Sequence, residues 1–213
     1  MITTVKNLIF PSNTYLISDA NKHCIIIDPG LSPELVFSEI DQKNLVPKAI
    51  ISTHGHFDHV AGVATLREKY DLPFYLHEKD EKLARSGNFY LKLMKINFFI
   101  KPTKPNFLLE GFKNIVKVED FTITFYNYPG HSKGSCILQY ENNLFCGDSI
   151  YKNGLGFNNF PGENKNELKT TILSIIESFP RDQNIYPGHG DSFKLKDLSN
   201  NKELMQFLSN NDK

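Results

Sequence analysis

Histidine is concentrated in one short stretch of this chain. Three of the seven histidines fall within the heptapeptide THGHFDH at residues 53–59. Imidazole nitrogens and carboxylate oxygens are ligands that transition-metal ions such as Zn²⁺ take in proteins. Alternate side chains of an extended loop point the same way, so His54 and His56 can bind one ion together, while Asp58 and His59 are offset toward a second. The stretch therefore predicts a metal site.

Three further side chains of metal-binding type stand beside glycine at the ends of apolar segments. They are His131 in Pro-Gly-His-Ser, Asp148 in Gly-Asp-Ser and His189 in Pro-Gly-His-Gly. Glycine lets the backbone turn sharply and approach other groups closely. Taken alone, each of the three is more often a simple turn residue. Together with the first cluster they give five histidines and two aspartates, the inventory of a dinuclear transition-metal site.

The remaining histidines and the three cysteines stand apart from these motifs. His23 opens an apolar segment and His77 closes one, and we interpret both as structural. Cys24, Cys136 and Cys146 form no C-x-x-C pair and no even disulfide framework. We therefore expect three buried free thiols.

Alternating strand-like and helix-like segments must position the candidate ligands. Strands are predicted over residues 14–18, 23–28, 48–52, 73–77, 115–118, 121–128, 135–140, 144–146 and 184–186. Helices are predicted from residue 32 and over residues 60–70, 78–85, 164–179 and 198–208. A strand–helix pattern in each half predicts a single domain of residues 1–213 with an α/β (α+β) fold, two β-sheets packed together with helices outside.

The segment 86–107 is rich in aromatic residues and harder to assign. One interpretation is a helix plus a loop packed onto the core. The alternatives are an apolar lid or substrate wall, or a dimer face.

Composition and charge disfavour several classes of protein. The 213 residues are 40% hydrophobic and 23% charged, which is typical of a globular domain. Lys plus Arg total 24, equal to Asp plus Glu, and only three are arginine, so a nucleic-acid partner is disfavoured. No apolar run approaches the ~20 residues of a membrane span, and Pro11 and Asn13 interrupt the apolar start, so we expect no signal peptide. We expect a cytoplasmic monomer or homodimer that binds neither nucleic acid nor membrane.

The motifs, taken in order, resemble those of a known family. T-H-x-H-x-D-H, P-G-H-S, G-D-S and P-G-H-G are similar to motifs of the metallo-β-lactamase superfamily, particularly its short glyoxalase II-like (hydroxyacylglutathione hydrolase-like) branch. The resemblance covers nearly the whole chain, including residues 13–15, 27–30 and 160–162. It implies a four-layer αβ/βα sandwich of two mixed β-sheets, with two metal ions at the sheet edges.

The resemblance also implies a role for each candidate residue. It assigns His54, His56 and His131 to a first ion, Asp58, His59 and His189 to a second, and Asp148 as the bridge between them. Asp28 matches a position that supports the site from outside the ligand set, although an Asp before Pro-Gly can equally be a turn residue. The expected ions are two Zn²⁺, with iron or manganese as alternatives.

Such a centre predicts hydrolysis of a small molecule. Two neighbouring cations lower the pKa of a bridging water from 15.7 toward about 7, and one of them also receives the oxyanion of the tetrahedral intermediate. The sequence reveals no Ser-His-Asp arrangement and no dedicated general acid, and Asp58 is the candidate for proton shuttling. A thiolate with a pKa of about 8.5 leaves without a strong acid. We therefore expect a thioester or an activated ester as substrate.

The chain departs from the glyoxalase II-like pattern shortly after Asp148. Those enzymes tend to carry Lys or Arg after a G-x-G stretch, whereas Phe157 follows Gly154-Leu155-Gly156 here. An aromatic ring makes no charge-assisted hydrogen bond to a substrate carboxylate. Phe157 and the aromatic segment predict a less polar acyl or leaving group, while Lys152 and Lys133 are the candidate replacement cations.

Other activities of similar folds are the alternatives. Persulfide dioxygenases keep H-x-H-x-D-H but use one iron held by two His and one Asp, so an oxidoreductase is the main alternative. A lactonase is a second alternative, because hydroxide attack on a ring ester uses the same metal site as thioester hydrolysis. β-Lactam hydrolysis is disfavoured because those enzymes usually lack a carboxylate equivalent to Asp148. RNA processing is disfavoured because no basic face or RNA-gripping segment is visible. A metal-free binding module is disfavoured because all seven candidate ligands are present.

Overall fold

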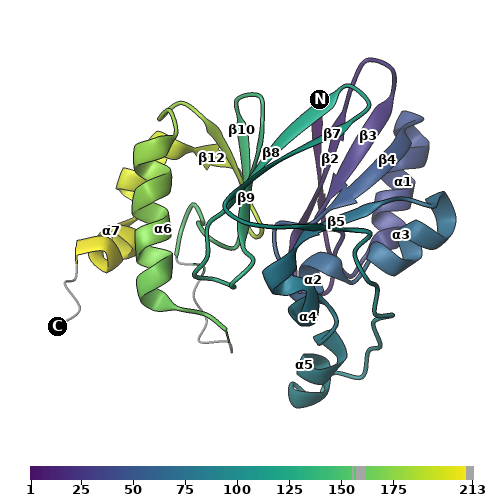
Figure 1. Ribbon diagram of the computed structural model, residues 1–213, viewed down its shortest axis with the longest axis horizontal. Coiled ribbons are helices and arrows are strands. Elements are labelled where there is room, and N and C mark those ends of the chain that lie inside the picture. The colour runs from purple at the N-terminus through teal and green to yellow at the C-terminus, as the bar shows by residue number, and fades with distance from the viewer. Residues whose placement is uncertain (155, 157–161, 210–213) are drawn as a thin grey trace.

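Two six-stranded β-sheets face each other, and helices cover their outer surfaces (Figure 1). The computed structural model describes residues 1–154, 156 and 162–209. Helices α1 and α3 cover the first sheet, and α6 and α7 cover the second. The four layers are therefore helix, sheet, sheet and helix, as the sequence predicts.

The first sheet contains the N-terminal strands in their chain order. These are β1 (Ile2–Lys6), β2 (Asn13–Ser18), β3 (His23–Ile27), β4 (Val46–Ile51), β5 (Phe74–His77) and β6 (Phe107–Leu109). β1 to β3 pair antiparallel and β3 to β6 pair parallel, so the sheet is mixed. The parallel strands are connected by α1 (Pro33–Lys43), α2 (Phe57–Val60), α3 (Val63–Tyr70), η1 (Glu78–Asp80), α4 (Glu81–Ala84) and α5 (Gly87–Leu93).

The second sheet has the order β12-β11-β10-β9-β8-β7 and is also mixed. Its strands are β7 (Lys113–Val118), β8 (Phe121–Asn127), β9 (Cys136–Tyr140), β10 (Asn143–Gly147), β11 (Asn184–Pro187) and β12 (Phe193–Lys194). α6 (Lys165–Ser178) connects β10 to β11, and η2 (Leu195–Asn200) and α7 (Lys202–Ser209) follow β12. The Asn164 side chain accepts hydrogen bonds from the first-turn amides of α6 and so fixes where that helix begins.

Alternation along the strands fills the core on both faces of each sheet. Tyr15 and Ile17 of β2 pack into the cluster between the two sheets, whereas Leu16 packs into the cluster beneath α1 and α3. A third cluster lies between the second sheet and α6 and α7. Because successive side chains of a strand point to opposite faces, a continuous apolar run can bury both faces of one sheet.

The predicted architecture is confirmed, while several element boundaries are corrected. The helix predicted over residues 60–70 is divided into α2 and α3, and the one predicted over 198–208 is divided at Asn201, whose side chain accepts a hydrogen bond from the Leu204 amide and starts α7. Strands β1, β6 and β12 were not predicted. In the described part of the chain, no helix has the length and apolar character needed to cross a membrane.

Candidate metal centre

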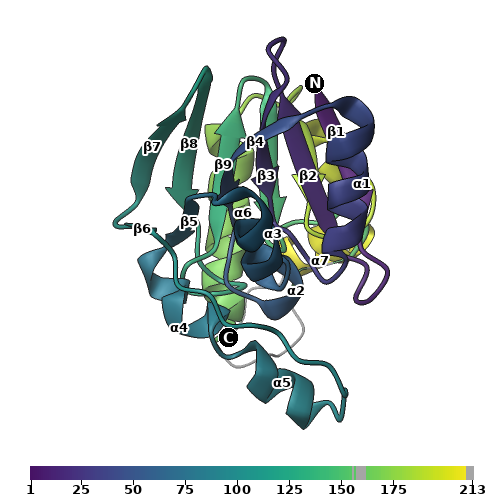
Figure 2. The same ribbon diagram turned by 90° about the vertical axis from the view of Figure 1, so that its right-hand side faces the viewer.

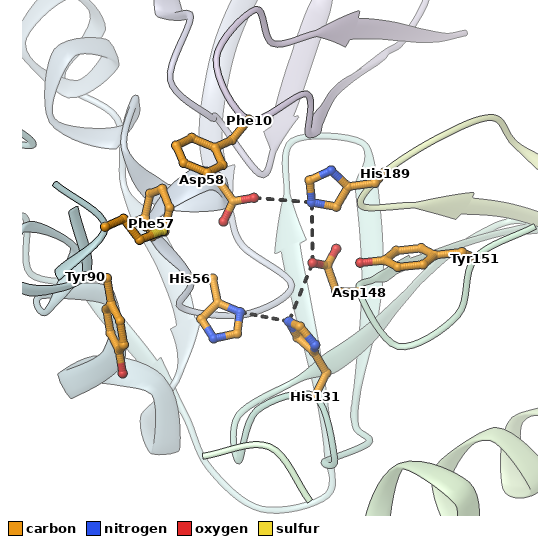
Figure 3. Close-up of a pocket in the computed structure, with 10 residues that line it drawn as sticks. Phe10, His56, Phe57, Asp58, Tyr90, His131, Asp148, Tyr151 and His189 are labelled. Atoms are coloured by element: carbon orange, nitrogen blue, oxygen red, sulfur yellow. Dashed lines mark hydrogen bonds and ion pairs between the residues drawn. The ribbon is translucent and has the colours of Figure 1, made fainter. Parts of the chain in front are cut away.

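The seven predicted ligands lie together at one edge of the two sheets. Figure 3 shows those that border the cavity: His56, Asp58, His131, Asp148 and His189. Four of them follow β4, in the loop that leads into α2 and in α2 itself. His131 lies in the turn between β8 and β9, Asp148 directly follows β10, and His189 follows β11. Four strand ends from both sheets thus bring side chains that are far apart in sequence to one place.

The first set consists of three imidazoles. His56 Nδ1 lies 2.8 Å from His131 Nε2, and the His54 ring centroid lies 4.9 and 4.8 Å from the centroids of His56 and His131. Burial, together with the neighbouring His131, lowers the pKa of His56 to about 3. Burial also lowers the pKa of His54. Neutral imidazole is the form that binds a metal ion, so this set is suited to one.

The second set combines a carboxylate with two imidazoles. Asp58 Oδ2 lies 3.2 Å from His189 Nε2 and 3.5 Å from His59 Nε2. Burial by itself lowers the pKa of His189, but hydrogen bonds to Asp148 and Asp58 outweigh it and raise the pKa to about 9. The same carboxylates raise the pKa of His59 in spite of its burial. The carboxylates of Asp58 and Asp148 therefore favour a positive charge beside His59 and His189.

Asp148 lies between the two sets. Its Oδ1 is 3.4 Å from His59 Nε2. Its Oδ2 is 3.5 Å from both His131 Nε2 and His189 Nε2 (Figure 3). A Cβ atom on Gly188 would overlap Asp148 Oδ1 and would come within 2.8 Å of His59 Cε1. Only glycine fits at residue 188, which gives a physical reason for the Pro-Gly-His-Gly motif.

Three buried polar side-chain atoms in this centre have no hydrogen-bond partner among the described residues. They are His54 Nε2, His59 Nε2 and Asp148 Oδ1. A buried polar atom without a partner costs about 1–3 kcal/mol, so its presence calls for an explanation. All three belong to residue types that coordinate transition metals, and the atoms of each set lie within 4.8 Å of one another. The residues present therefore fit divalent metal ions.

Asp28 is buried beside this centre and contacts residues of both sets, directly or through Thr53. Its Oδ1 accepts a hydrogen bond from the Thr53 amide (2.7 Å), and its Oδ2 accepts one from Thr53 Oγ1 (2.6 Å). Asp28 Oδ2 also lies 3.2 Å from His59 Nδ1, and Thr53 Oγ1 lies 3.0 Å from His54 Nδ1. A carboxylate on Nδ1 fixes the tautomer of His59 and leaves Nε2 available to an ion. The predicted supporting residue thus contacts a member of the second set directly and one of the first through Thr53.

Asp80 is a second buried carboxylate beside this centre, and no sequence motif predicted it. It is 1% exposed and accepts hydrogen bonds at Oδ2 from Gly55 N (2.8 Å) and Ser132 Oγ (2.6 Å), and at Oδ1 from Gly134 N (2.7 Å). It thereby ties the loop that carries His54 and His56 to the loop that carries His131. In the sequence, Asp80 stands among charged residues of a helix start and has the pattern of a solvent-exposed position.

A cavity of about 370 Å³ opens onto the two sets. It is lined by Phe10, His56, Phe57, Asp58, Tyr90, Met94, His131, Asp148, Tyr151 and His189. Phe10 and Tyr151 were not predicted: neither belongs to a ligand motif, although Tyr151 stands three residues after Asp148. Burial and the adjacent Asp148 raise the pKa of Tyr151 well above its usual value, so the phenol keeps its proton.

Neither of the two candidate lysines is part of this lining. Lys152 is exposed and borders a neighbouring depression together with Tyr151 and His189. Lys133 is exposed and borders a different depression, beside Lys79 and Glu163. Phe157 lies outside the described residues, so its predicted role stays a prediction.

The other two histidines and the cysteines take structural positions. His23 Nδ1 lies 3.3 Å from Asp19 Oδ2, and His77 Nε2 lies 3.0 Å from the Gly111 carbonyl oxygen. The three cysteines are free and buried, as expected: Cys24, Cys136 and Cys146.

The chain belongs to the metallo-beta-lactamase superfamily, because the sequence model of that family matches residues 8–189. The resemblance predicted from the motifs is therefore confirmed. The probable metallo-hydrolase YqgX of Bacillus subtilis (strain 168) is 30% identical over 178 residues, which cover 83% of each chain. The hydroxyacylglutathione hydrolase GloC of Haemophilus influenzae (strain ATCC 51907 / DSM 11121 / KW20 / Rd) is 30% identical over 185 residues, 85% of this chain and 86% of GloC.

Solved structures agree with this assignment. The crystal structure of BLEG-1 B3 metallo-beta-lactamase has a TM-score of 0.88 and 26% identity, and the match covers 99% of this chain and 100% of that one. The crystal structure of TTHA1623 in a di-iron-bound form has a TM-score of 0.80 and 28% identity, with 94% and 98% covered.

Proposed function

We propose that this protein is a metal-dependent hydrolase that cleaves small-molecule thioesters at a centre of two divalent ions. The ions would be held by His54, His56 and His131, by Asp58, His59 and His189, and by Asp148 between them. The observation that carries the proposal is the position of Asp148, whose carboxylate lies 3.4–3.5 Å from histidines of both sets. A carboxylate in that position would help to hold the ions of both sets.

The chemistry divides between the ions and the protein. Bound ions would activate a water molecule for attack on a carbonyl group and stabilise the charge that develops on its oxygen. Asp58 borders the cavity, and we propose that its carboxylate accepts the proton released in that attack. Tyr151 borders the same cavity as a neutral phenol, and its oxygen can accept a hydrogen bond from the substrate.

A thioester suits this set of groups. A thiolate leaves with a pKa of about 8.5, so the reaction proceeds without a strong acid behind the leaving group. The relative named hydroxyacylglutathione hydrolase supports the same choice, because its name describes hydrolysis of a thioester of glutathione. The resemblance to a B3 metallo-beta-lactamase makes β-lactam hydrolysis the activity to measure beside it.

The identity of the ions is part of the proposal. Five histidines and two carboxylates suit zinc, iron and manganese, and we assign zinc. The di-iron form of TTHA1623 means that iron must be measured in the same experiment.

The proposal is tested by loading the purified protein separately with Zn²⁺, Fe²⁺ and Mn²⁺ and offering each form four kinds of substrate. These are neutral and anionic thioesters, a γ-lactone, a chromogenic β-lactam, and glutathione persulfide with oxygen uptake recorded. We expect thioester cleavage that a chelator abolishes, that added ion restores, and that His56→Ala loses. Oxygen uptake on the persulfide with no thioester cleavage would instead indicate a dioxygenase, and lactone cleavage alone a lactonase.

A further inference from the structure

One wall of the cavity is apolar and faces the candidate ligands (Figure 3). Phe10, from the loop between β1 and β2, packs edge-on against Phe57, with ring centroids 5.1 Å apart and an interplanar angle of 88°. Tyr90 of α5 and Met94 just after it continue the wall. The wall thus combines residues from three separate parts of the chain, and none of them belongs to the proposed ligand sets.

The α5 part of this wall is held firmly in place, although α5 projects from the end of the sandwich (Figures 1 and 2). Leu91 and Ile100 are buried and pack in one cluster with Phe57. The Asn88 side chain donates to the Ile100 carbonyl oxygen (2.7 Å) and accepts from the Ile100 amide (2.8 Å). A Cβ atom on Gly87 would come within 2.8 Å of Phe57 Cβ, so glycine permits this close approach. Tyr90 and Met94 are therefore positioned before a substrate arrives.

The described lining of the cavity differs from the surrounding surface in its content of lysine and arginine. Among the described residues that line the cavity, there is no lysine and no arginine. The nearby cations Lys92, Lys95 and Lys152 are exposed and lie outside the lining, and residues 155–161, LGFNNFP, contain none. Away from the candidate ligands, a carboxylate of a charged carrier such as glutathione would therefore meet neither lysine nor arginine in the described lining, which is unfavourable.

We propose that the cavity takes the apolar acyl chain of the thioester, and that Tyr90 and Met94 set the length of chain that it accepts. This inference rests on the proposed thioester hydrolysis. Biological thiol carriers are polar or charged, so the acyl side is the part of such a substrate that an apolar wall suits. Each methylene buried against the wall should raise kcat/KM about fourfold until the cavity is full.

The test is a series of straight-chain acyl thioesters of N-acetylcysteamine, from acetyl to octanoyl, beside S-lactoylglutathione. We expect kcat/KM to rise about fourfold per methylene over the first steps. Met94→Ala and Tyr90→Ala should each reduce that slope, chiefly through KM. Leu93→Ala is the matched control, because Leu93 lies on the same helix but is 69% exposed, and it should leave the slope unchanged. No dependence on chain length, or a preference for S-lactoylglutathione that Lys152→Ala removes, would overturn the inference.

A binding measurement distinguishes this inference from the proposed function. S-alkyl thioethers of N-acetylcysteamine cannot be hydrolysed, and calorimetry reports their affinity whether or not the protein is active. Affinity that grows with alkyl length and falls in Met94→Ala supports the apolar cavity even if no thioester is cleaved. Thioester cleavage together with thioether affinity that is independent of length contradicts the inference and leaves the proposed function intact.

Discussion

Replacing Asp80 with asparagine tests whether a carboxylate outside the centre holds the loops that carry the first set of histidines. The Asp80 oxygens accept from Gly55 N and Ser132 Oγ on one side and from Gly134 N on the other. An amide has the same shape but only one oxygen. Its NH₂ group must therefore face an N–H or hydroxyl donor on one of the two sides.

The cost of this change follows from the bonds that are altered. In its better orientation the asparagine oxygen faces Gly55 and Ser132, and its NH₂ group faces the Gly134 amide. One charge-assisted hydrogen bond is lost and a buried N–H is left without an acceptor, at a cost of about 2–4 kcal/mol. A domain of ordinary stability, about 5–15 kcal/mol, stays folded after such a loss. Loosening the loops should weaken binding of the first ion about 10–100-fold, the usual effect of removing a group that orients metal ligands.

Stepwise titration with Co²⁺, followed by visible absorbance, measures the two binding steps separately. We expect Asp80→Asn to weaken one step and leave the other unchanged, and His56→Ala to abolish that same step. Asp41→Asn is the matched control, because the Asp41 side chain lies on α1, is 68% exposed and pairs with Lys69. Urea denaturation of each metal-free variant gives the accompanying loss of stability.

Two results would refute the reasoning about Asp80. If both binding steps weaken equally and in proportion to the lost stability, Asp80 contributes to the fold in general and does not position the first set. If neither step changes, the hydrogen bonds from Gly55, Ser132 and Gly134 have no bearing on the ligands.

Three further predictions follow from other parts of the chain. Gly188→Ala should abolish binding of both ions, because its Cβ would displace Asp148. Gly111→Ala is the control: Gly111 has a φ of 73° and no atom within 4 Å of the added Cβ, so the change should cost only about 1 kcal/mol of stability. Calorimetric metal titration measures ion binding by both variants, and urea denaturation measures their stability. Burial raises the pKa of Cys24 to about 12 and those of the other two thiols as well, so at pH 8 all three remain protonated, and Ellman's reagent should react with none until the protein is unfolded. Phe157→Arg should shift the ratio of kcat/KM values toward anionic thioesters, since it supplies a cation at the position where glyoxalase II-like enzymes carry one, and an unchanged ratio would contradict the predicted role.

Much of the site could be predicted because its residues are recognisable locally. His54 and His56 stand at ligand spacing after a buried strand, and Asp148 and His189 each stand beside a glycine at a strand end. Apolar runs with turn signals between them were enough to indicate two sheets with helices outside. The short edge strands β1, β6 and β12 were missed because each has few buried residues of its own and depends on pairing with a neighbour.

The missed residues act across long stretches of chain. Asp80 is 25 residues from Gly55 and 52 from Ser132, and its importance arises only when β5 and the turn after β8 come together. Phe10 meets Phe57 through tertiary packing of the loop between β1 and β2, whereas Tyr90 lies in the aromatic segment 86–107, for which a substrate wall was one of the interpretations. No pattern within a short window marks Asp80 or Phe10, since their role is defined by tertiary contact.

The most direct test of the central claim, that two ions at this centre carry out hydrolysis, is the metal content measured by mass spectrometry. It is measured on the wild-type protein and on one ligand variant from each of the two sets. After loading with excess Zn²⁺ and desalting, we expect about two zinc ions per wild-type chain, and about one in both His56→Ala and Asp58→Asn. Thioester turnover should accompany the two-ion form and be lost from both variants. A single iron per wild-type chain that zinc does not displace, with no thioester turnover, would contradict the dinuclear hydrolase.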